Sequence, residues 1–163
     1  MIISQSREEI QAAIALQSKC ELKRVGLRQA HASIESTESE LTAPFSIRVS
    51  HNSIANAIVD RVLRIEGRFQ VHGYDSSDCP ALLFSVECAF DLDYEIQDKS
   101  FEPTEQSISA FKDGNAIFNC WPYARELVNS LTSRMDLHVP PLPFLRIVPK
   151  PITVPKAESS EKP

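Results

Sequence analysis

Long parts of the chain alternate apolar and polar residues with the two-residue period of a strand that has one buried face. The clearest runs from Leu82 to Ile96, where every even position is apolar and most odd positions are polar. Residues 59–71 alternate in the opposite phase, with two exceptions. The turn-rich segment YDSSDCP lies between the two stretches, so we predict a long antiparallel hairpin.

The polar faces of these two strands carry opposite charges. We expect Arg68 to lie opposite Glu87 and Arg64 to lie opposite Asp91, which would pair the faces by charge. The acidic positions are Glu87, Asp91, Asp93 and Glu95. On one side of an extended strand they form a flat site that is open to water. We therefore interpret them as a solvated face or a docking face for a partner, rather than as a general acid/base pair.

Two further segments fit the same sheet. Residues 22–35 change phase once, which predicts a strand with a β-bulge near Arg28 and Gln29. The segment 45–54 begins to alternate, but the polar residues HNS interrupt it, and we interpret it as a crossover before the hairpin. A sheet with one apolar face needs helices or another subunit to cover that face.

Helical spacing of apolar residues predicts three helices. Ser6 and Glu9 match a capping box for a helix at 7–19. A second helix is expected at 104–112, where the residues DGN would break it. A third is expected at 122–135, with a proline in its first turn.

The chain after Leu137 is too rich in proline for a helix or a central strand. Because Pro140, Pro141 and Pro143 lack N–H donors, we expect this arm to lie over the sheet as a movable lip. Its apolar side chains are either core residues or part of a binding groove, as are the aromatic residues of the segment FNCWPY.

Length and composition predict a single α+β domain. The 163 residues, 42% of them hydrophobic, are enough for one core. We divide the chain into an N-terminal helical extension at 1–20, a domain at 21–150 and a polar disordered tail at 151–163. From the strand and helix patterns, the domain is expected to hold a sheet of three or four strands whose apolar face is covered by helices or by another subunit.

Charge and motif content argue against several classes of function. A net charge of -5 and a pI near 5.4 give no basic surface for nucleic acid. The N-terminal segment does not have the pattern of a signal peptide, and no stretch reaches the roughly 20 apolar residues of a membrane span, so we expect a cytoplasmic protein without membrane insertion. The Cys and His residues lack ligand spacing and no nucleotide-binding glycine motif occurs, so no metal or cofactor is expected.

The run WPYARELVNSLTSR, followed by PPLPFLRIVP, closely resembles the SecB family of protein-export chaperones. In that family FPYARE begins a helix that ends in a Ser-Arg pair, and a Pro- and Leu-containing arm follows. The resemblance implies an α+β fold with a four-stranded antiparallel sheet and helices packed on one face. It also implies a homotetramer, built as a dimer of dimers, that holds unfolded polypeptides without ATP and delivers preproteins to the SecA motor. It implies a chaperone and not an enzyme.

Combined with the proline pattern, the resemblance suggests two sites. The client groove is placed between the 45–54 segment and the helix-plus-arm segment, and its predicted residues are Phe45, Ile47, Ile54, Trp121, Leu142, Phe144 and Leu145. Glu35 and Glu87 align with acidic residues of the face that docks SecA in the family.

The sequence also departs from the family pattern. His31 occupies another acidic position of the first strand, and a Pro-rich arm with a short tail stands where the family has a last helix. These departures favour a divergent member, including the kind that protects the antitoxin of a toxin–antitoxin pair. A different class, an enzyme with a long helix on an antiparallel sheet, would need a carboxylate under the helix, for which Asp113 is the only candidate.

Overall fold

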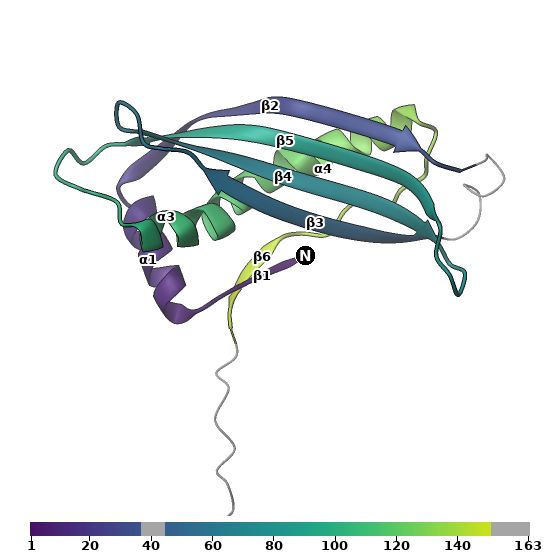
Figure 1. The fold of residues 1–163 in the computed structure, drawn as a ribbon, viewed down its shortest axis with the longest axis horizontal. Helices are drawn as coiled ribbons and strands as arrows, with labels where there is room; N and C mark the ends of the chain where they lie inside the picture. The colour runs from purple at the N-terminus through teal and green to yellow at the C-terminus, as the bar shows by residue number, and fades with distance from the viewer. Residues whose placement is uncertain (37–44, 151–163) are drawn as a thin grey trace, which may run out of the picture.

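A four-stranded antiparallel sheet forms one layer of the protein, and helices with an extended arm cover one of its faces (Figure 1). The computed structural model describes residues 1–36 and 45–150. The strands lie in the order β2-β5-β4-β3, so β2 and β3 form the edges. Their bounds are Cys20–Ile34 for β2, Phe45–Ala55 for β3, Val62–Asp75 for β4 and Leu82–Ile96 for β5. The predicted α+β class and sheet are confirmed, whereas the predicted tail at 151–163 lies outside the described residues.

The predicted hairpin of β4 and β5 is present, but its register was wrong by two residues. Arg64 lies opposite Asp93, and Gln70 lies opposite Glu87. A shift of two keeps every side chain on its own face, so the hydrophobic pattern cannot detect it. The turn sets the register instead: the Asp75 carboxylate accepts hydrogen bonds from the backbone N–H groups of Ser77 and Ala81.

The segment at 45–54 is not a crossover, because β3 continues through its polar residues and pairs with β4 along its whole length. An edge strand tolerates polar inward positions because they lie at the margin of the core. There the Ser53 hydroxyl donates a hydrogen bond of 2.6 Å to the Asp113 carboxylate. The next strand begins only at Val62, because Asp60 and Arg61 adopt positive φ angles of 48° and 65° in a turn.

Strand β2 carries the predicted bulge, as a register shift between Leu27 and Gln29. A second shift, between Leu22 and Arg24, was missed. The two bulges bend this 15-residue edge strand along its partner β5.

The N-terminal helix and the first covering helix form as predicted. In α1 (Arg7–Gln17), the Ser6 hydroxyl accepts from the Glu9 N–H and the Glu9 carboxylate accepts from the Ser6 N–H, which completes the capping box. Thr104 caps α3 (Glu105–Phe111) in the same position.

The residues DGN do not break the helical layer. They lie in a π-helical turn, η1 (Lys112–Ala116), which leads directly into α4 (Ile117–Arg134). The Gln5 side chain donates a 2.7 Å hydrogen bond to the Ala110 carbonyl next to this turn, and a Cβ on Gly114 would lie only 2.7 Å from the Gln5 side-chain oxygen. The predicted third helix therefore starts five residues earlier than expected, and Pro122 lies inside it on an exposed side.

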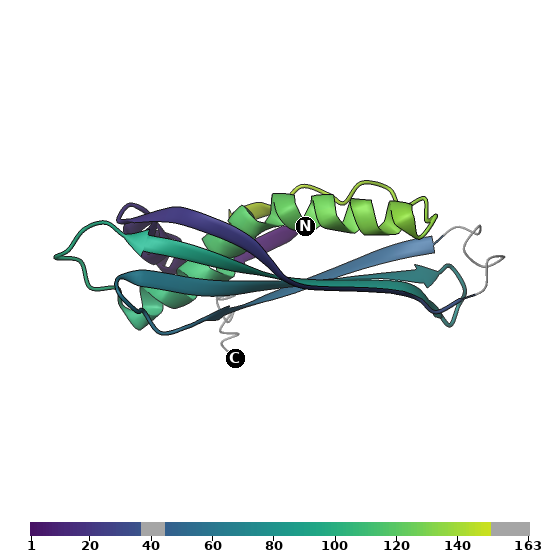
Figure 2. The same cartoon turned by 90° about the horizontal axis from the view of Figure 1, so that it is seen from above.

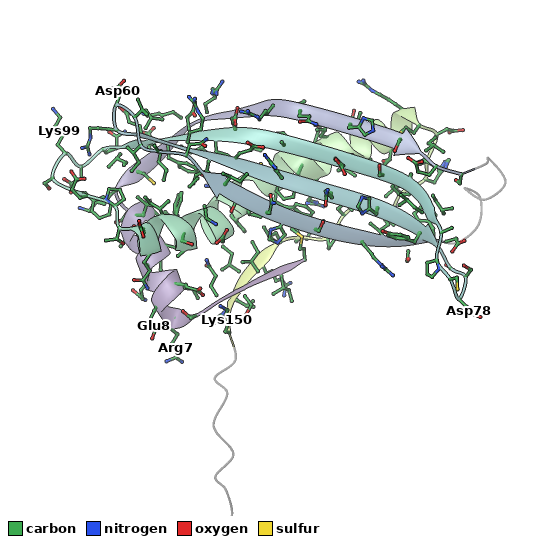
Figure 3. All side chains as sticks on the ribbon, viewed as in Figure 1. Arg7, Glu8, Asp60, Asp78, Lys99 and Lys150 are labelled. Carbon is green, nitrogen blue, oxygen red and sulfur yellow. The ribbon has the colours of Figure 1, made fainter. Side chains whose placement is uncertain are left out.

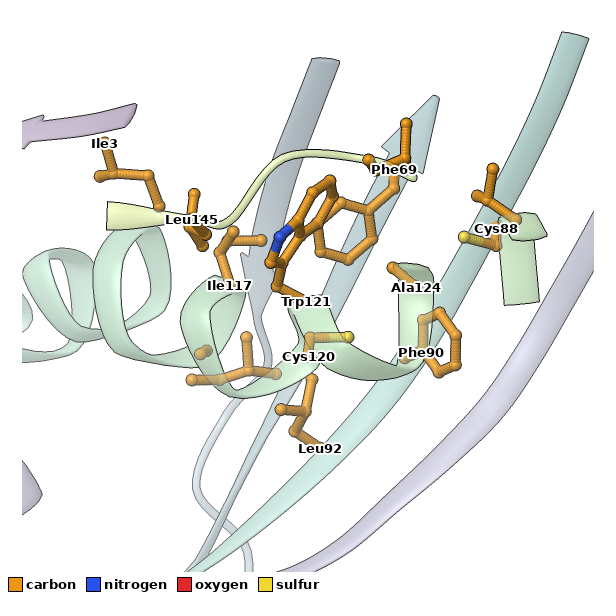
Figure 4. Close-up of a cluster of buried hydrophobic side chains, with 14 of the residues drawn as sticks. Ile3, Phe69, Cys88, Phe90, Leu92, Ile117, Cys120, Trp121, Ala124 and Leu145 are labelled. Carbon is orange, nitrogen blue, oxygen red and sulfur yellow. The ribbon is translucent and has the colours of Figure 1, made fainter. Parts of the chain in front are cut away.

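The core lies between α4 and the inner face of β4 and β5 (Figures 2 and 4). The Trp121 and Phe69 rings lie 5.5 Å apart. The small residues Cys120 and Ala124 are fully buried, which lets the helix approach the sheet closely. Burying each large apolar side chain of this layer stabilises the fold by about 1.5–3 kcal/mol.

A second, two-stranded sheet is present that no pattern in the sequence predicts. Strand β1 (Ile2–Gln5) pairs in parallel with β6 (Arg146–Pro149), with Ile3 opposite Ile147. Ile3 and Gln5 point into the protein and are buried. The expected helical extension thus begins with a strand that ties down the end of the Pro-rich arm.

Replacing Gly73 by alanine should lower the free energy of unfolding by about 1–3 kcal/mol, because overpacking forces the core to shift. A Cβ at Gly73 would lie 2.0 Å from a ring carbon of Phe84, which is fully buried and packs edge-on against Phe45. Urea unfolding measures the loss. Gly26→Ala is the matched control, since its Cβ would meet only the Arg24 side chain at 3.7 Å; equal losses in both variants would contradict the packing argument.

Candidate functional site

The Pro-rich arm runs back beside α4 and is fixed by three contacts (Figure 2). The Trp121 indole N–H donates a 3.0 Å hydrogen bond to the Pro143 carbonyl. Leu142 and Leu145, which flank this carbonyl, are only 6% exposed and belong to the core. The arm is therefore anchored at this point rather than free.

Phe144 points the other way and is 76% exposed. The guanidinium of Arg125 lies over its ring, 4.6 Å from the centroid. Such a cation–π contact fixes the ring loosely and contributes about 0.5–1 kcal/mol at an exposed site. The lip thus presents one large apolar side chain to solvent in a defined position.

A groove of about 320 Å³ separates the arm from α4. It is lined by Pro122, Arg125, Glu126, Val128, Asn129 and Thr132 of the helix and by Val139, Pro140, Pro141 and Leu142 of the arm. Within the described part of the chain, the buried Nε–H of Arg125 has no acceptor. A buried donor without a partner favours a ligand that brings an oxygen. The groove has the size of a pocket for one or two side chains.

The structure brings together only part of the predicted client groove. Phe45 and Ile47 are half-buried on the inner face of β3 and pack against the core. Trp121 is buried under the arm. Ile54 occupies an even position of β3, which turns it to the outward face of the sheet, away from the helices and the arm. Their role in client binding remains a prediction.

Three of the groove residues on α4, namely Arg125, Glu126 and Asn129, were visible in the sequence only as helical positions outside the apolar stripe, whereas Val128 belongs to that stripe. Helical periodicity turns Arg125, Glu126 and Asn129 away from the sheet. Only the path of the arm shows that this side of α4 faces Pro140 and Pro141. A proline-rich segment has no periodicity from which that path could be predicted.

The outward face of the sheet carries the acidic row, and arginines on the neighbouring strands pair with it. Asp93 accepts hydrogen bonds from Arg24 at 2.8 Å and from Arg64 at 2.6 Å. Arg28 contacts Asp91 at 3.3 Å. The predicted pairing of the polar faces by charge is thus present, in the shifted register.

Glu35 and Glu87, the predicted docking residues, both lie on this outward side. Glu35 follows β2, where its N–H donates to the Leu83 carbonyl at 2.8 Å. Glu87 lies opposite His31 of β2, and its carboxylate accepts a 3.1 Å hydrogen bond from Gln70. Whether they dock a partner remains a prediction.

Catalytic chemistry finds little support in the described residues. No group of three or more His, Cys, Asp or Glu within 1–36 and 45–150 is arranged to hold a metal ion. Asp113, the only candidate for a catalytic carboxylate, is exposed, and its carboxylate accepts hydrogen bonds from Ser53 and Lys112. Burial raises the pKa of the Cys88 thiol to about 11, so this thiol stays protonated and acts as a packing group.

No helix in the described ranges is long and apolar enough to cross a bilayer.

The one-faced sheet with its helix layer and arm is the fold of a SecB-like chaperone. The solved structure of the Mycobacterium tuberculosis Rv1957 SecB-like chaperone, in complex with a ChAD peptide from the Rv1956 HigA1 antitoxin, matches it with a TM-score of 0.73 at 16% identity. The match covers 85% of this chain and 99% of that one.

Sequence similarity points to the same proteins. The chain is 32% identical over 111 residues to the SecB-like chaperone MT2006 of M. tuberculosis strain CDC 1551 / Oshkosh, which is 68% of this chain and 56% of MT2006. It is 38% identical over 63 residues to the SecB-like chaperone Rv1957 of strain H37Rv, which is 39% of this chain and 33% of Rv1957. The matched region thus spans about half of the first relative and a third of the second. No family model matches the sequence. The chain belongs to the SecB-like family.

Leu142 and Phe144 should respond differently to replacement by serine. Leu142→Ser should lower the free energy of unfolding by about 2–5 kcal/mol, because it removes a core side chain. Phe144→Ser should cost less than about 1 kcal/mol, because only the contact with Arg125 is lost. Urea melts of the two single variants measure both values, and a large loss in Phe144→Ser would show that this ring is a packing residue.

The pairing of Asp93 should make the stability depend on pH. Hydrogen bonds from Arg64 and Arg24 lower the pKa of the Asp93 carboxyl. Its contribution is therefore complete above the pKa of the unfolded chain, near 4, and is lost as the pH falls through the lower folded value. The difference in unfolding free energy between the native protein and Asp93→Asn should shrink below about pH 4. A difference that stays constant from pH 7 to pH 2.5 would contradict this account.

Proposed function

We propose that the protein is a non-catalytic, cytosolic chaperone that holds an extended segment of a dedicated protein partner, as an antitoxin chaperone does. The observation that carries the proposal is the groove between α4 and the arm, with Phe144 exposed at its rim. Support comes from the related Rv1957 chaperone, whose solved structure contains an antitoxin peptide.

The groove suits an extended segment with one or two apolar side chains. Pro140 and Pro141 in the wall have no N–H, so the arm cannot close the groove by pairing as a strand. A client side chain that entered the groove and covered Phe144 would gain roughly 1.5–3 kcal/mol for each large side chain buried. The Arg125 Nε–H is itself buried, so a client carbonyl or carboxylate oxygen would accept from it only after this side chain turns toward the groove.

Selectivity for one partner follows from the same features. The groove has a volume of about 320 Å³, which admits only one or two side chains, and the polar groups in its wall have fixed positions. A ligand that leaves the Arg125 donor buried without an acceptor loses about 1–3 kcal/mol relative to one that satisfies it. These features favour one matched segment over many unrelated ones.

A general holdase that delivers preproteins to SecA is the second candidate. Its support is the position of Glu35 and Glu87 on one outward face, as the family resemblance requires. The arginines that accompany the remaining acidic residues make that face less acidic than a SecA-docking surface should be.

A homotetramer would give each client several grooves. In the described parts of the chain no strand pairs with the outer edge of β2, and Leu27, Ile34 and Tyr123 are large apolar residues exposed on β2 and α4. An unpaired edge beside an apolar strip is suited to pairing with a second copy. Several grooves in one assembly would strengthen binding, because later contacts form at high effective concentration.

Phe144→Ser should weaken binding of a matched peptide at least about tenfold, which corresponds to about 1.4 kcal/mol. Suitable probes are the ChAD peptide of the HigA1 antitoxin, which the solved Rv1957 structure contains, and a carboxymethylated, permanently unfolded protein. Fluorescence anisotropy gives the affinities, and light scattering gives the assembly mass with and without ligand. Ile14→Ser on α1 is the control, because Ile14 is also exposed and does not line the groove.

Equal affinity of native protein and Phe144→Ser would rule out the groove as the client site. Affinities for the antitoxin peptide and the unfolded protein that agree within threefold would favour the general holdase over the dedicated chaperone. A mass that stays at one subunit at micromolar concentration would contradict the tetramer.

A further inference from the structure

Four arginines form ion pairs with the acidic residues on the outward face of the sheet, the face opposite α4 and the arm. Arg24 and Arg28 come from β2, and Arg64 and Arg68 come from β4. Their side chains are 50–55% exposed, whereas the paired side chains of Glu66, Asp91 and Asp93 are only 11–17% exposed. The carboxylates thus lie beneath the guanidinium groups, and a partner approaching this face meets positive charge first.

Among the described residues, three of these arginines donate hydrogen bonds through Nε only, and their terminal nitrogens are left available to a partner. The carboxylate partner takes only the Nε–H of Arg24, Arg64 and Arg68, at 2.8, 2.6 and 2.6 Å. Within residues 1–36 and 45–150, no hydrogen bond involves their terminal nitrogens. The ion pairs hold each guanidinium in place, so its remaining donors are preorganised for carboxylate oxygens of a partner.

The spacing of these groups suits one segment with several acidic side chains. Arg64 and Arg68 are four residues apart on β4, or roughly 13 Å, and Arg24 and Arg64 are separated by β5, or roughly 10 Å. Beside Arg68 the face is hollowed by about 330 Å³, with the amide side chains of Gln29 and Asn52 in its lining. A segment can therefore meet both charged and neutral donors on this face.

We propose that this face docks an acidic segment of a protein partner. It is a second surface, separate from the groove proposed for the client. In the middle of the patch four arginines lie against three carboxylates, and Glu21, Glu87 and Glu95 lie only at its ends, so the exposed positive charge is confined to the middle.

A peptide fits the patch better than a nucleic acid does. Glu21 and Glu95 lie opposite each other at one end of the patch, and Glu87 lies at the other. A nucleic acid carries a negative charge at every nucleotide, so a strand that crossed the patch would be repelled by the carboxylates at both ends. An acidic protein segment can carry its carboxylates in the middle only.

The test uses the full chain and a fluorescent 12-residue peptide of alternating Glu and Ser, at 50 mM and 200 mM salt. Arg64→Gln/Arg68→Gln removes two exposed guanidinium groups, while Asp93 keeps Arg24 and Glu66 keeps Arg28. We expect the affinity to fall at least tenfold in this variant. Arg7→Gln/Lys99→Gln removes the same charge far from the patch, since both residues lie elsewhere on the surface (Figure 3), and we expect less than a twofold change.

Arg64→Lys/Arg68→Lys keeps the charge without the planar fork, and we expect an intermediate loss. Circular dichroism spectra and holding of an unfolded client should be unchanged in all variants. If the peptide does not bind the arginine patch, the proposal for the client groove is therefore not affected. Three results would overturn the proposal: no binding of the peptide to the native protein at 50 mM salt, equal losses in the Gln variants of both sites, or tighter binding of a 12-nucleotide single-stranded DNA that the Arg64→Gln/Arg68→Gln variant also loses.

Discussion

The close approach of α4 to β4 is the contact on which the remaining structure depends. A Cβ on Gly67 would lie 3.4 Å from the Cys120 sulfur, so the helix and the strand already touch at this glycine. The close contact seals the inner face of β4 and β5 and brings Trp121 against Phe69. Because Trp121 also holds the Pro143 carbonyl, the arm takes its position from the same contact. One face of the sheet is thus covered by α4 and the arm, and the other face carries charged side chains.

Much of the sheet could be predicted because it has one wet face. The alternation from Leu82 to Ile96 predicted both ends of β5 correctly. The same pattern failed where the two faces differ less. At the edge strand β3 the inward positions include His51 and Ser53, which a central strand would not tolerate. The polar residues therefore predict a crossover where the structure has a continuous strand.

The errors in the helices and the short strands have different physical causes. The residues DGN predict a helix break from local propensity, but contacts with Gln5 and with Gln17 hold them in a π turn. Neither partner is near in sequence. Strands β1 and β6 have four residues each, too few for a periodic signal, and each is stable only because the other lies beside it.

The candidate site was predictable by region and not by residue. The predicted helix and arm do line the groove, yet Leu142 and Phe144 are one proline apart and face opposite ways. In an extended segment a side chain's direction depends on what anchors the backbone, here the Trp121 hydrogen bond. The parity of Ile54 could have been predicted from the alternation that begins at Phe45, once β3 is known to be continuous.

The pairing of β1 with β6 also sets an order of events during synthesis. About 140 residues separate Ile2 from its neighbour Arg146. At 5–20 residues per second, the ribosome needs on the order of ten seconds to make that stretch. Throughout this time Ile3 lacks its neighbour Ile147, and Trp121, once it has been made, lacks the arm that covers it for a much shorter time. The growing chain therefore exposes apolar surface until β6, the last of the described strands, has been made and pairs with β1.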